Sequence, residues 1–339
     1  MPEAAKCYQC ESDNPVGVPS AINRDKNVSA TLDASNRQYH HRVEHPITLL
    51  RVSGEDAASF LQSQFSNNLR NMAHDRAVYG LWLDRKGKVC ADSFILQEGS
   101  GSFLLFSYEC SAATIKEKLE RFIVADDVVV ESIGASYLDL VVWGGHSSTR
   151  LGAAEGTYPA AASWYRSGEA LLVHGRRSTE KHADILIPLK DTALLEAYLL
   201  DLEKSGSMEV SWSEMEHERL RSRIPSVPRD VTPGELPQEG GLVDDAVCFT
   251  KGCYLGQEVM AHLKRSGGFR RRLHPVSMAG FPPSANALIY AGDKQAGELR
   301  SYLYNGSSGL GFALMKHREL AGRRQFSLFP DGPEAITIC

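Results

Sequence analysis

From residue 47 to residue 132 the spacing of apolar residues alternates between two periods. A period near two predicts a strand with one buried face, and a period near 3.6 predicts an amphipathic helix. The predicted order is strand, helix, three strands, helix and strand. The expected ranges are 47–52, 57–65, 78–83, 88–96, 102–107, 112–122 and 128–132. Because both helices can cover the same face of the sheet, this stretch predicts an α+β unit of ferredoxin-like type.

A second α+β unit is expected from residue 135 onward. Apolar segments at 137–142, 171–174 and 185–188 predict strands. Asp191 is a suitable N-cap for a helix that runs to about Leu202, and Gly206 is a suitable terminator. A further helix is expected over 213–223, before Pro225, and a connector rich in Pro and Gly follows at 224–241.

The last part of the chain has a different pattern. Short apolar segments at 273–278, 288–290, 311–314 and 326–329 are separated by turn residues. Such a pattern predicts a small antiparallel β-barrel or sandwich. We therefore expect four parts. They are an N-terminal extension at 1–43, a ferredoxin-like domain at 44–134, a second α+β domain at 135–270 and a C-terminal β-barrel domain at 271–339.

Several features of the sequence indicate the cellular compartment of the protein and limit the metal sites that it can form. No apolar run is long enough to cross a bilayer, so no membrane partner is expected. The first residues lack the layout of a signal or transit peptide, which predicts a cytoplasmic protein. The seven cysteines are scattered and odd in number, as expected for reduced thiols. Cys7 and Cys10 have the spacing of a redox or zinc site, but no second pair accompanies them, so no metal site is expected.

The distribution of charge limits the classes of partner. A net charge of −5 argues against direct nucleic-acid binding, since general nucleic-acid binders are basic overall. An RNA-binding module is therefore the weakest alternative. Five cations nevertheless lie between residues 264 and 272. They can form a solvated surface loop, or they can bind the carboxylates of a small anionic ligand.

The densest group of reactive side chains lies at 251–258, with the sequence Lys-Gly-Cys-Tyr-Leu-Gly-Gln-Glu. Its thiol, Cys253, can act as a nucleophile or as a soft-metal ligand, because Lys251 and nearby arginines would lower its pKa. It can also be a buried cysteine that packs as a small apolar residue. A redox pair with Cys248 is a further alternative.

This segment resembles the K-G-C-Y-x-G-Q-E motif of the YgfZ-type folate-binding proteins, which are related to the aminomethyltransferase (T-protein) of the glycine cleavage system. Further segments resemble the same family in the same order over about residues 45–320, namely VSGEDAASFLQSQFSNNL, GKVCADSFIL, RLRSRIP and GLGFAL. The resemblance implies three β-rich domains in a ring around a central channel. It also implies that tetrahydrofolate or a derivative binds in that channel.

The resemblance implies a role in the assembly or maintenance of iron–sulfur proteins, including tRNA-modifying iron–sulfur enzymes. Cys253 then becomes the expected functional thiol. Arg219 matches the family's helix arginine, which can bind a folate carboxylate or serve as a structural anchor. The residues expected at the folate site are Asn67, Arg219, Lys251, Tyr254, Gln257, Glu258 and Arg270.

The chain departs from the transferase relatives at two places. They carry two adjacent acids where this chain has Ala91-Asp92, and their chemistry needs a carboxylate near the reacting folate nitrogen. Their Gly-Glu pterin-recognition segment has no clear match between residues 150 and 190, which predicts weak folate binding or a different pose. The incomplete acid pair, together with the Cys253 motif, favours an accessory factor over a classical aminomethyltransferase. Whether the chain is an enzyme stays open.

The alternative is a folate-dependent, aminomethyltransferase-like one-carbon transferase with Asp92 as its lone acid. In either case one thiol cannot supply the four ligands of an iron–sulfur cluster. Any cluster contact at Cys253 is therefore expected to be transient or shared. The expected partners are folate and iron–sulfur client or assembly proteins.

Overall fold

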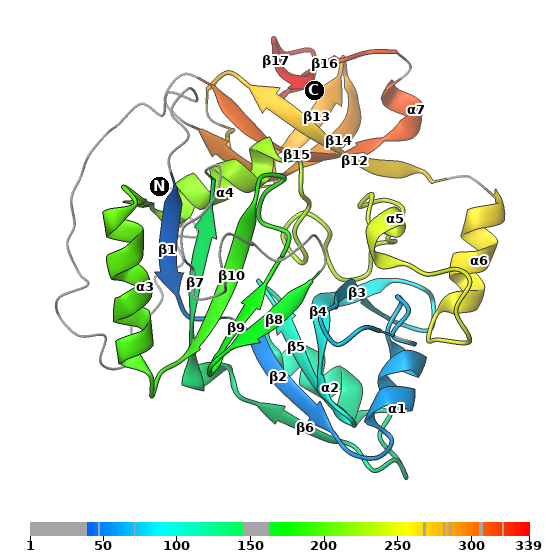
Figure 1. The fold of residues 1–339 in the computed structure, drawn as a ribbon. Coiled ribbons are helices and arrows are strands. Elements are labelled where there is room, and N and C mark those ends of the chain that lie inside the picture. The colour runs from blue at the N-terminus through cyan, green and yellow to red at the C-terminus, as the bar shows by residue number, and fades with distance from the viewer. Residues whose placement is uncertain are drawn as a thin grey trace, which may run out of the picture. The chain divides into compact units, whose positions relative to one another are not determined.

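The computed structural model describes residues 39–46, 48–70, 72–144, 163–266, 269–280, 282–284, 286–304, 308–320 and 322–339. Most of the expected N-terminal extension, with Cys7 and Cys10, lies outside these ranges. Within them the strands form two sheets and one closed barrel, so the predicted α+β class is confirmed (Figure 1). None of the described helices combines the length and the apolar character that a membrane span requires.

The first sheet follows the predicted order of strands and helices. Its elements are β2 (Thr48–Ser53), α1 (Ala57–Gln64), β3 (Ala77–Leu83), β4 (Val89–Gly99), β5 (Ser102–Ser107), α2 (Ala112–Glu120) and β6 (Val129–Ser132). The strand order is β3-β4-β5-β2-β6, and every pair is antiparallel. Asp84 closes the β3–β4 turn, because its carboxylate accepts hydrogen bonds from the backbone N–H groups of Lys86 and Lys88 at 2.8 and 2.9 Å.

The second sheet combines strands from distant parts of the chain. Its strands are β1 (His40–Glu44), β7 (Tyr137–Trp143), β8 (Trp164–Ser167), β9 (Ala170–Val173), β10 (His182–Pro188) and β11 (Met208–Glu209), in the order β11-β1-β7-β10-β9-β8. A 3-10 turn at Gly134–Ser136 precedes β7, and the helices of this region are α3 (Thr192–Lys204) and α4 (Trp212–Arg221). The predicted N-cap of α3 is confirmed, since Asp191 accepts a hydrogen bond from the backbone N–H of Leu194.

The two sheets pack face to face, with helices outside them. Phe94 and Phe106 of the first sheet share an apolar core with Leu171 and Val173 of the second. On its other face the first sheet packs against α1 and α2. On its other face the second sheet packs against α3. The result is four layers, in which the shared core fixes how the edges of the two sheets meet.

The C-terminal region forms a closed barrel, which decides between the two predicted arrangements. Its strands are β12 (Arg271–Met278), β13 (Leu288–Ala291), β14 (Lys294–Tyr304), β15 (Gly309–Lys316), β16 (Gln325–Ser327) and β17 (Glu334–Ile338), in the order β12-β15-β14-β13-β16-β17. Short helices α5 (Val243–Ala246) and α7 (His317–Leu320) and the longer α6 (Gln257–Ser266) complete the described elements. The connector before β12 carries both α5 and the Cys253 segment, so it leads from the sheets to the barrel.

Candidate functional site

The Cys253 segment is attached to the C-terminal end of α1. The backbone N–H of Cys248 donates to the carbonyl oxygen of Ser66 at 3.0 Å, and that of Leu255 donates to Ser63 at 3.1 Å. Gly256 lies against the β3–β4 turn with a φ of 84°, and a Cβ there would stand only 2.6 Å from the carbonyl oxygen of Asp84. Glycine is needed at this position because both the conformation and the contact exclude a side chain.

Lys251 fixes the same segment through its side chain. Its buried ammonium donates hydrogen bonds to the carbonyl oxygens of Gln62, Phe65 and Asn67 at 2.7, 2.6 and 2.7 Å. These carbonyls lie at and beyond the end of α1, where helical partners are missing and a cation is favoured. Burial lowers the pKa of Lys251 to about 8. The structure thus gives Lys251 a structural contact, and its expected contact with folate stays a prediction.

The two cysteines of the segment have different surroundings. Cys253 is exposed, which excludes the alternative of a buried apolar cysteine. Cys248 is half-buried, and its Sγ lies 3.5 Å from the Thr250 hydroxyl oxygen. Burial opposes ionisation of Cys248, but hydrogen bonds from the Thr250 hydroxyl and from the backbone of Thr250 and Lys251 outweigh it and lower the pKa of the thiol. This effect at Cys248 was not predicted from the sequence.

The other residues of the motif serve the local structure to different extents. Tyr254 packs into the core beside the Lys251 ammonium, which lies 5.1 Å from its ring centroid, and burial raises the pKa of its phenol to about 12. Gln257 donates a hydrogen bond to the carbonyl oxygen of Lys251 at 3.3 Å. Glu258 is exposed in the first turn of α6. The segment therefore buries its phenol and ammonium and leaves a thiol and a carboxylate at the surface.

Arg219 has the contacts of an anchor. Its guanidinium pairs with Glu216 and Asp230 at 2.6 and 2.7 Å, donates to Ser301, and is only 9% exposed. The resemblance implied that Arg219 binds a folate carboxylate or serves as a structural anchor. These contacts match the anchor, because protein carboxylates already accept from the N–H donors of the guanidinium. Arg270 is exposed just before β12, and it does not line the cavity described next.

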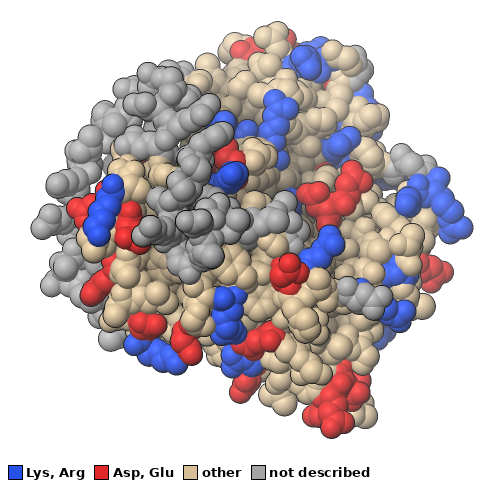
Figure 2. All heavy atoms as spheres, in the orientation of Figure 1, with Lys and Arg blue, Asp and Glu red and all other residues tan. Residues whose placement is uncertain are grey.

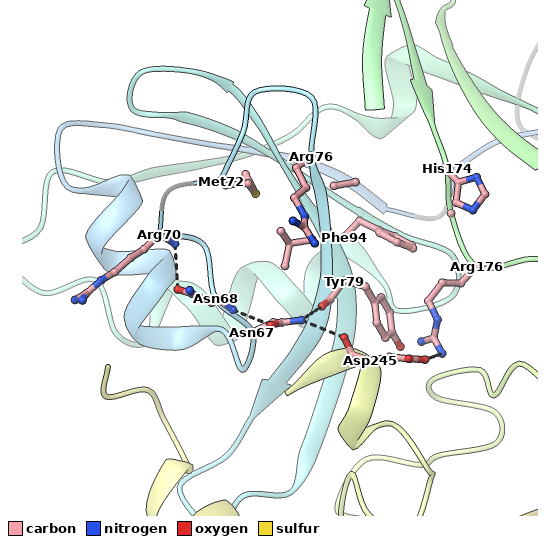
Figure 3. A pocket seen from close by; sticks show the side chains of 13 residues that line it. Asn67, Asn68, Arg70, Met72, Arg76, Tyr79, Phe94, His174, Arg176 and Asp245 are labelled. Carbon is pink, nitrogen blue, oxygen red and sulfur yellow. Dashed lines mark hydrogen bonds and ion pairs between the residues drawn. The ribbon is translucent and has the colours of Figure 1, made fainter. Parts of the chain in front are cut away.

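A cavity of about 520 Å³ lies between the first sheet, the turn after β9 and helix α5 (Figure 3). Of the residues predicted to bind folate, Asn67 lines it. The Asn67 amide donates hydrogen bonds to the carbonyl oxygens of Tyr79 and Asp245 at 2.8 and 3.1 Å, so it ties β3 to α5. Arg70 also lines the cavity, and its guanidinium lies against Gly252, the residue before Cys253. Arg70 is thus the connection between the cavity and the exposed thiol.

Asp92 lies behind the cavity wall and is not among the lining residues. Its carboxylate accepts hydrogen bonds from the Tyr79 hydroxyl at 2.8 Å, the Ser107 hydroxyl at 3.1 Å and the Cys110 thiol at 3.3 Å. Burial raises the pKa of Asp92, although these hydrogen bonds favour its anion. Tyr79 lines the cavity in front of Asp92. The hydrogen bond from the Tyr79 hydroxyl to Asp92 therefore holds the orientation of this side chain in the wall.

A cation of the cavity wall was missed by the sequence analysis. The Arg176 guanidinium lies 4.0 Å from the ring centroid of Tyr79 and pairs with Asp245 at 3.0 Å. The available signal was the pair of cations Arg176-Arg177 directly after a buried strand. The neighbouring Arg177 instead pairs with Glu44, Asp139 and Asp184 away from the cavity. Among the described residues, no three His, Cys, Asp or Glu side chains are placed to hold a metal ion.

Comparisons with known proteins agree with this architecture. A family model of the GCVT N-terminal domain matches residues 45–175, and a model of the CAF17 C-terminal beta-barrel domain matches residues 270–332. The glycine cleavage system aminomethyltransferase T of Bartonella henselae has a similar fold, with a TM-score of 0.73 at 14% sequence identity over 89% of this chain and 86% of that one. The predicted aminomethyltransferase-like fold is therefore confirmed.

Two groups of curated proteins are similar in sequence. The human mitochondrial iron–sulfur cluster assembly factor IBA57 is 29% identical over 296 residues, which cover 81% of this chain and 77% of that protein. The tRNA-modifying protein YgfZ of Edwardsiella ictaluri (strain 93-146) is 28% identical over 244 residues, which cover 68% of this chain and 71% of that protein. The chain therefore combines a GCVT N-terminal domain with a CAF17-type C-terminal barrel, and it is similar in sequence to proteins named IBA57 and YgfZ.

Proposed function

We propose that this protein is a tetrahydrofolate-binding accessory factor for the assembly or maintenance of iron–sulfur proteins, including iron–sulfur enzymes that modify tRNA. The observation that carries the proposal is the exposed thiol of Cys253 on a segment held by Lys251 and Gly256. An exposed thiol on a fixed backbone can meet a partner without a rearrangement of the segment. The names of IBA57, an iron–sulfur cluster assembly factor, and of YgfZ, a tRNA-modifying protein, support this reading.

The chemistry of the cavity supports tetrahydrofolate as the ligand. Its volume lies within the range of about 300–1,000 Å³ that is usual for small-molecule sites. Tyr79 and Phe94 contribute aromatic side chains to the lining, and the guanidinium groups of Arg76 and Arg176 can meet carboxylates. Tetrahydrofolate joins a reduced pterin to a glutamate through a p-aminobenzoyl group, so it offers ring surface and carboxylates to the two kinds of side chain.

The surface near Cys253 suits a partner with an acidic face. Exposed cations lie on the elements that touch this segment, and Figure 2 shows Lys and Arg side chains gathered over α6. They are Arg70, Arg85, Lys86, Lys264 and Arg265. A cluster held by thiolates is itself anionic, and complementary charge speeds the encounter of two proteins. The proposed partner is an iron–sulfur client or assembly protein that supplies the remaining cluster ligands, so contact with Cys253 is transient.

Complementation tests the role of the thiol. In a strain that lacks this protein, we expect Cys253→Ser to leave iron–sulfur enzyme activity near the deletion level. Cys339→Ser is the matched control, because Cys339 is also exposed but lies outside the segment, and it should restore activity fully. Full restoration by Cys253→Ser, at equal protein level, would show that the thiol has no such role.

The alternative is a one-carbon transferase, and the contacts of Asp92 weigh against it. A catalytic carboxylate must reach the reacting nitrogen, whereas Asp92 is buried behind Tyr79 with three hydrogen-bond donors already placed. Formation of methylene-tetrahydrofolate from an aminomethyl donor, lost in Asp92→Asn, would favour the transferase. We expect no turnover with such donors.

The cytoplasm is the compartment that we propose. Human IBA57 is mitochondrial by its name, so the mitochondrion is the alternative. Microscopy of the tagged full-length chain in its own cell distinguishes the two.

A further inference from the structure

An ion pair at the cavity joins a well-held cation to an exposed acid. Arg176 Nη2 lies 3.0 Å from Asp245 Oδ2 (Figure 3). The Arg176 side chain is only 17% exposed and rests on the Tyr79 ring, whereas the Asp245 side chain is 62% exposed. Water competes strongly for an exposed carboxylate, so such a pair is readily exchanged. A cation that is covered by protein and paired with an exposed acid is suited to receive another carboxylate.

The backbone at Arg176 is held from behind. Its N–H donates to the Tyr108 hydroxyl oxygen at 2.9 Å, and that hydroxyl donates to Asp184 at 2.7 Å. The preceding residue is Gly175, where a Cβ would stand only 1.7 Å from the Tyr108 hydroxyl oxygen. The missing side chain at Gly175 therefore permits the contact that fixes the backbone of Arg176 beside the cavity.

The acid of the pair lies on the short helix α5 and is anchored through its backbone. Asn67 donates to the carbonyl oxygen of Asp245, while the Asp245 carboxylate is largely exposed and pairs with Arg176. Among the described residues, Asp245 pairs with Nη2 of the Arg176 fork. A ligand carboxylate that met both terminal nitrogens would gain the stronger bidentate geometry.

We propose that Arg176 selects an anionic ligand for this cavity, and that the Asp245 carboxylate occupies the ligand's carboxylate position until it is displaced. The ligand class is a flat ring that carries a carboxylate on a flexible arm. The inference rests on the proposed function, in which this ligand is tetrahydrofolate and the displacing group belongs to its glutamyl part. Asp245 then acts as a built-in competitor, so only a ligand whose carboxylate displaces it gains the contact with Arg176.

Calorimetric titration of the full chain at low salt tests this assignment. We expect Arg176→Gln to weaken tetrahydrofolate binding at least tenfold and Asp245→Asn to strengthen it severalfold. Arg176→Lys keeps the charge without the fork, so it should fall between Arg176→Gln and the wild type. Arg166→Gln is the matched control, because Arg166 pairs with Glu98 at 2.6 Å outside the cavity, and its affinity should equal that of the wild type.

A second ligand separates recognition of the carboxylate from damage to the cavity. 6,7-Dimethyltetrahydropterin is a reduced pterin without a carboxylate, so its affinity should be the same for the wild type and Arg176→Gln. If Arg176→Gln weakens the affinity for both ligands equally, the substitution disrupts the cavity, and the assignment is overturned.

The remaining outcomes distinguish this inference from the proposed function. If wild type and Arg176→Gln bind tetrahydrofolate equally, Arg176 does not select the ligand, while the folate proposal stands. If Asp245→Asn binds no more tightly than wild type, the displacement step is wrong. If the wild type binds neither compound, the folate part of the proposed function fails, and this inference fails with it.

Discussion

The ammonium of Lys251 donates a hydrogen bond of 2.6 Å to the carbonyl oxygen of Phe65, just beyond the end of α1. Two more carbonyl oxygens accept from the same nitrogen. A lysine in a reactive-looking segment thus completes the end of a helix that lies far away in the sequence. The thiol two residues later is held in place by this contact.

Lys251→Met should destabilise the protein by about 2–4 kcal/mol, because three buried carbonyl groups lose their donor. Urea unfolding measures the change in the free energy of unfolding. Lys86→Met is the control, since Lys86 is exposed in the β3–β4 turn, and it should change that free energy by less than about 0.5 kcal/mol. Equal effects of the two substitutions would show that the contacts of Lys251 do not stabilise the fold.

Gly256→Ala should be more harmful than Gly234→Ala. Both glycines have a positive φ, 84° at Gly256 and 95° at Gly234, so both substitutions carry backbone strain of about 1–3 kcal/mol. At Gly256 the new Cβ also meets the Asp84 carbonyl oxygen, whereas nothing lies within 4 Å at Gly234. The difference between their melting temperatures isolates this contact, and no difference would contradict it.

Cys248 should be alkylated at lower pH in the folded protein than in the urea-unfolded chain, because its hydrogen bonds lower the pKa of the thiol. Mass spectrometry after short iodoacetamide treatment at a series of pH values gives the midpoint for this cysteine. Thr250→Val removes the hydroxyl donor and should move the midpoint upward. An unchanged midpoint in Thr250→Val would assign the effect to something other than that hydroxyl.

The buried group of Arg177, Glu44, Asp139 and Asp184 should make stability depend on pH. Burial, followed by the neighbouring Asp184 carboxylate, raises the pKa of Asp139 well above its usual value, while Arg177 opposes the shift. The folded protein therefore holds a proton that the unfolded chain releases above a pH of about 4. The contribution of this proton to the free energy of unfolding is fully present below a pH of about 4. It is lost as the pH rises through the raised pKa of folded Asp139.

Asp139→Asn should remove this loss, since an amide does not titrate. Urea unfolding between pH 5 and pH 8 should show a smaller fall in the free energy of unfolding for Asp139→Asn than for the wild type. Parallel curves for the two proteins would mean that Asp139 does not hold the proton.

Arg219→Met should destabilise the fold by about 3–5 kcal/mol, because Glu216 and Asp230 would lose a buried partner. The folded fraction should bind tetrahydrofolate with wild-type affinity, since the Arg219 fork is already occupied. Calorimetry on the folded variant, with urea unfolding beside it, measures both effects. A large loss of affinity for tetrahydrofolate, with an unchanged free energy of unfolding, would show that Arg219 binds the ligand.

The sequence by itself determined the order of the strands and helices of the first sheet, because the spacing of apolar residues depends only on neighbours along the chain. The N-cap at Asp191 was predictable for the same reason. The motif resemblance also directed attention to Cys253, which is exposed as a functional thiol requires. These features need no knowledge of which distant segments meet.

Only the tertiary structure decided what most polar side chains touch. Lys251 and Arg219 have the residue types of ligand-binding cations. Carbonyl groups from a distant part of the chain occupy Lys251, and carboxylates from its own helix and the following connector occupy Arg219. Arg176 and Asp245 lie 69 residues apart, and packing of the two sheets and the connector brings them to one cavity. A side chain that can bind a ligand is available only if the fold has not already supplied its partner, and that depends on contacts between distant parts of the chain.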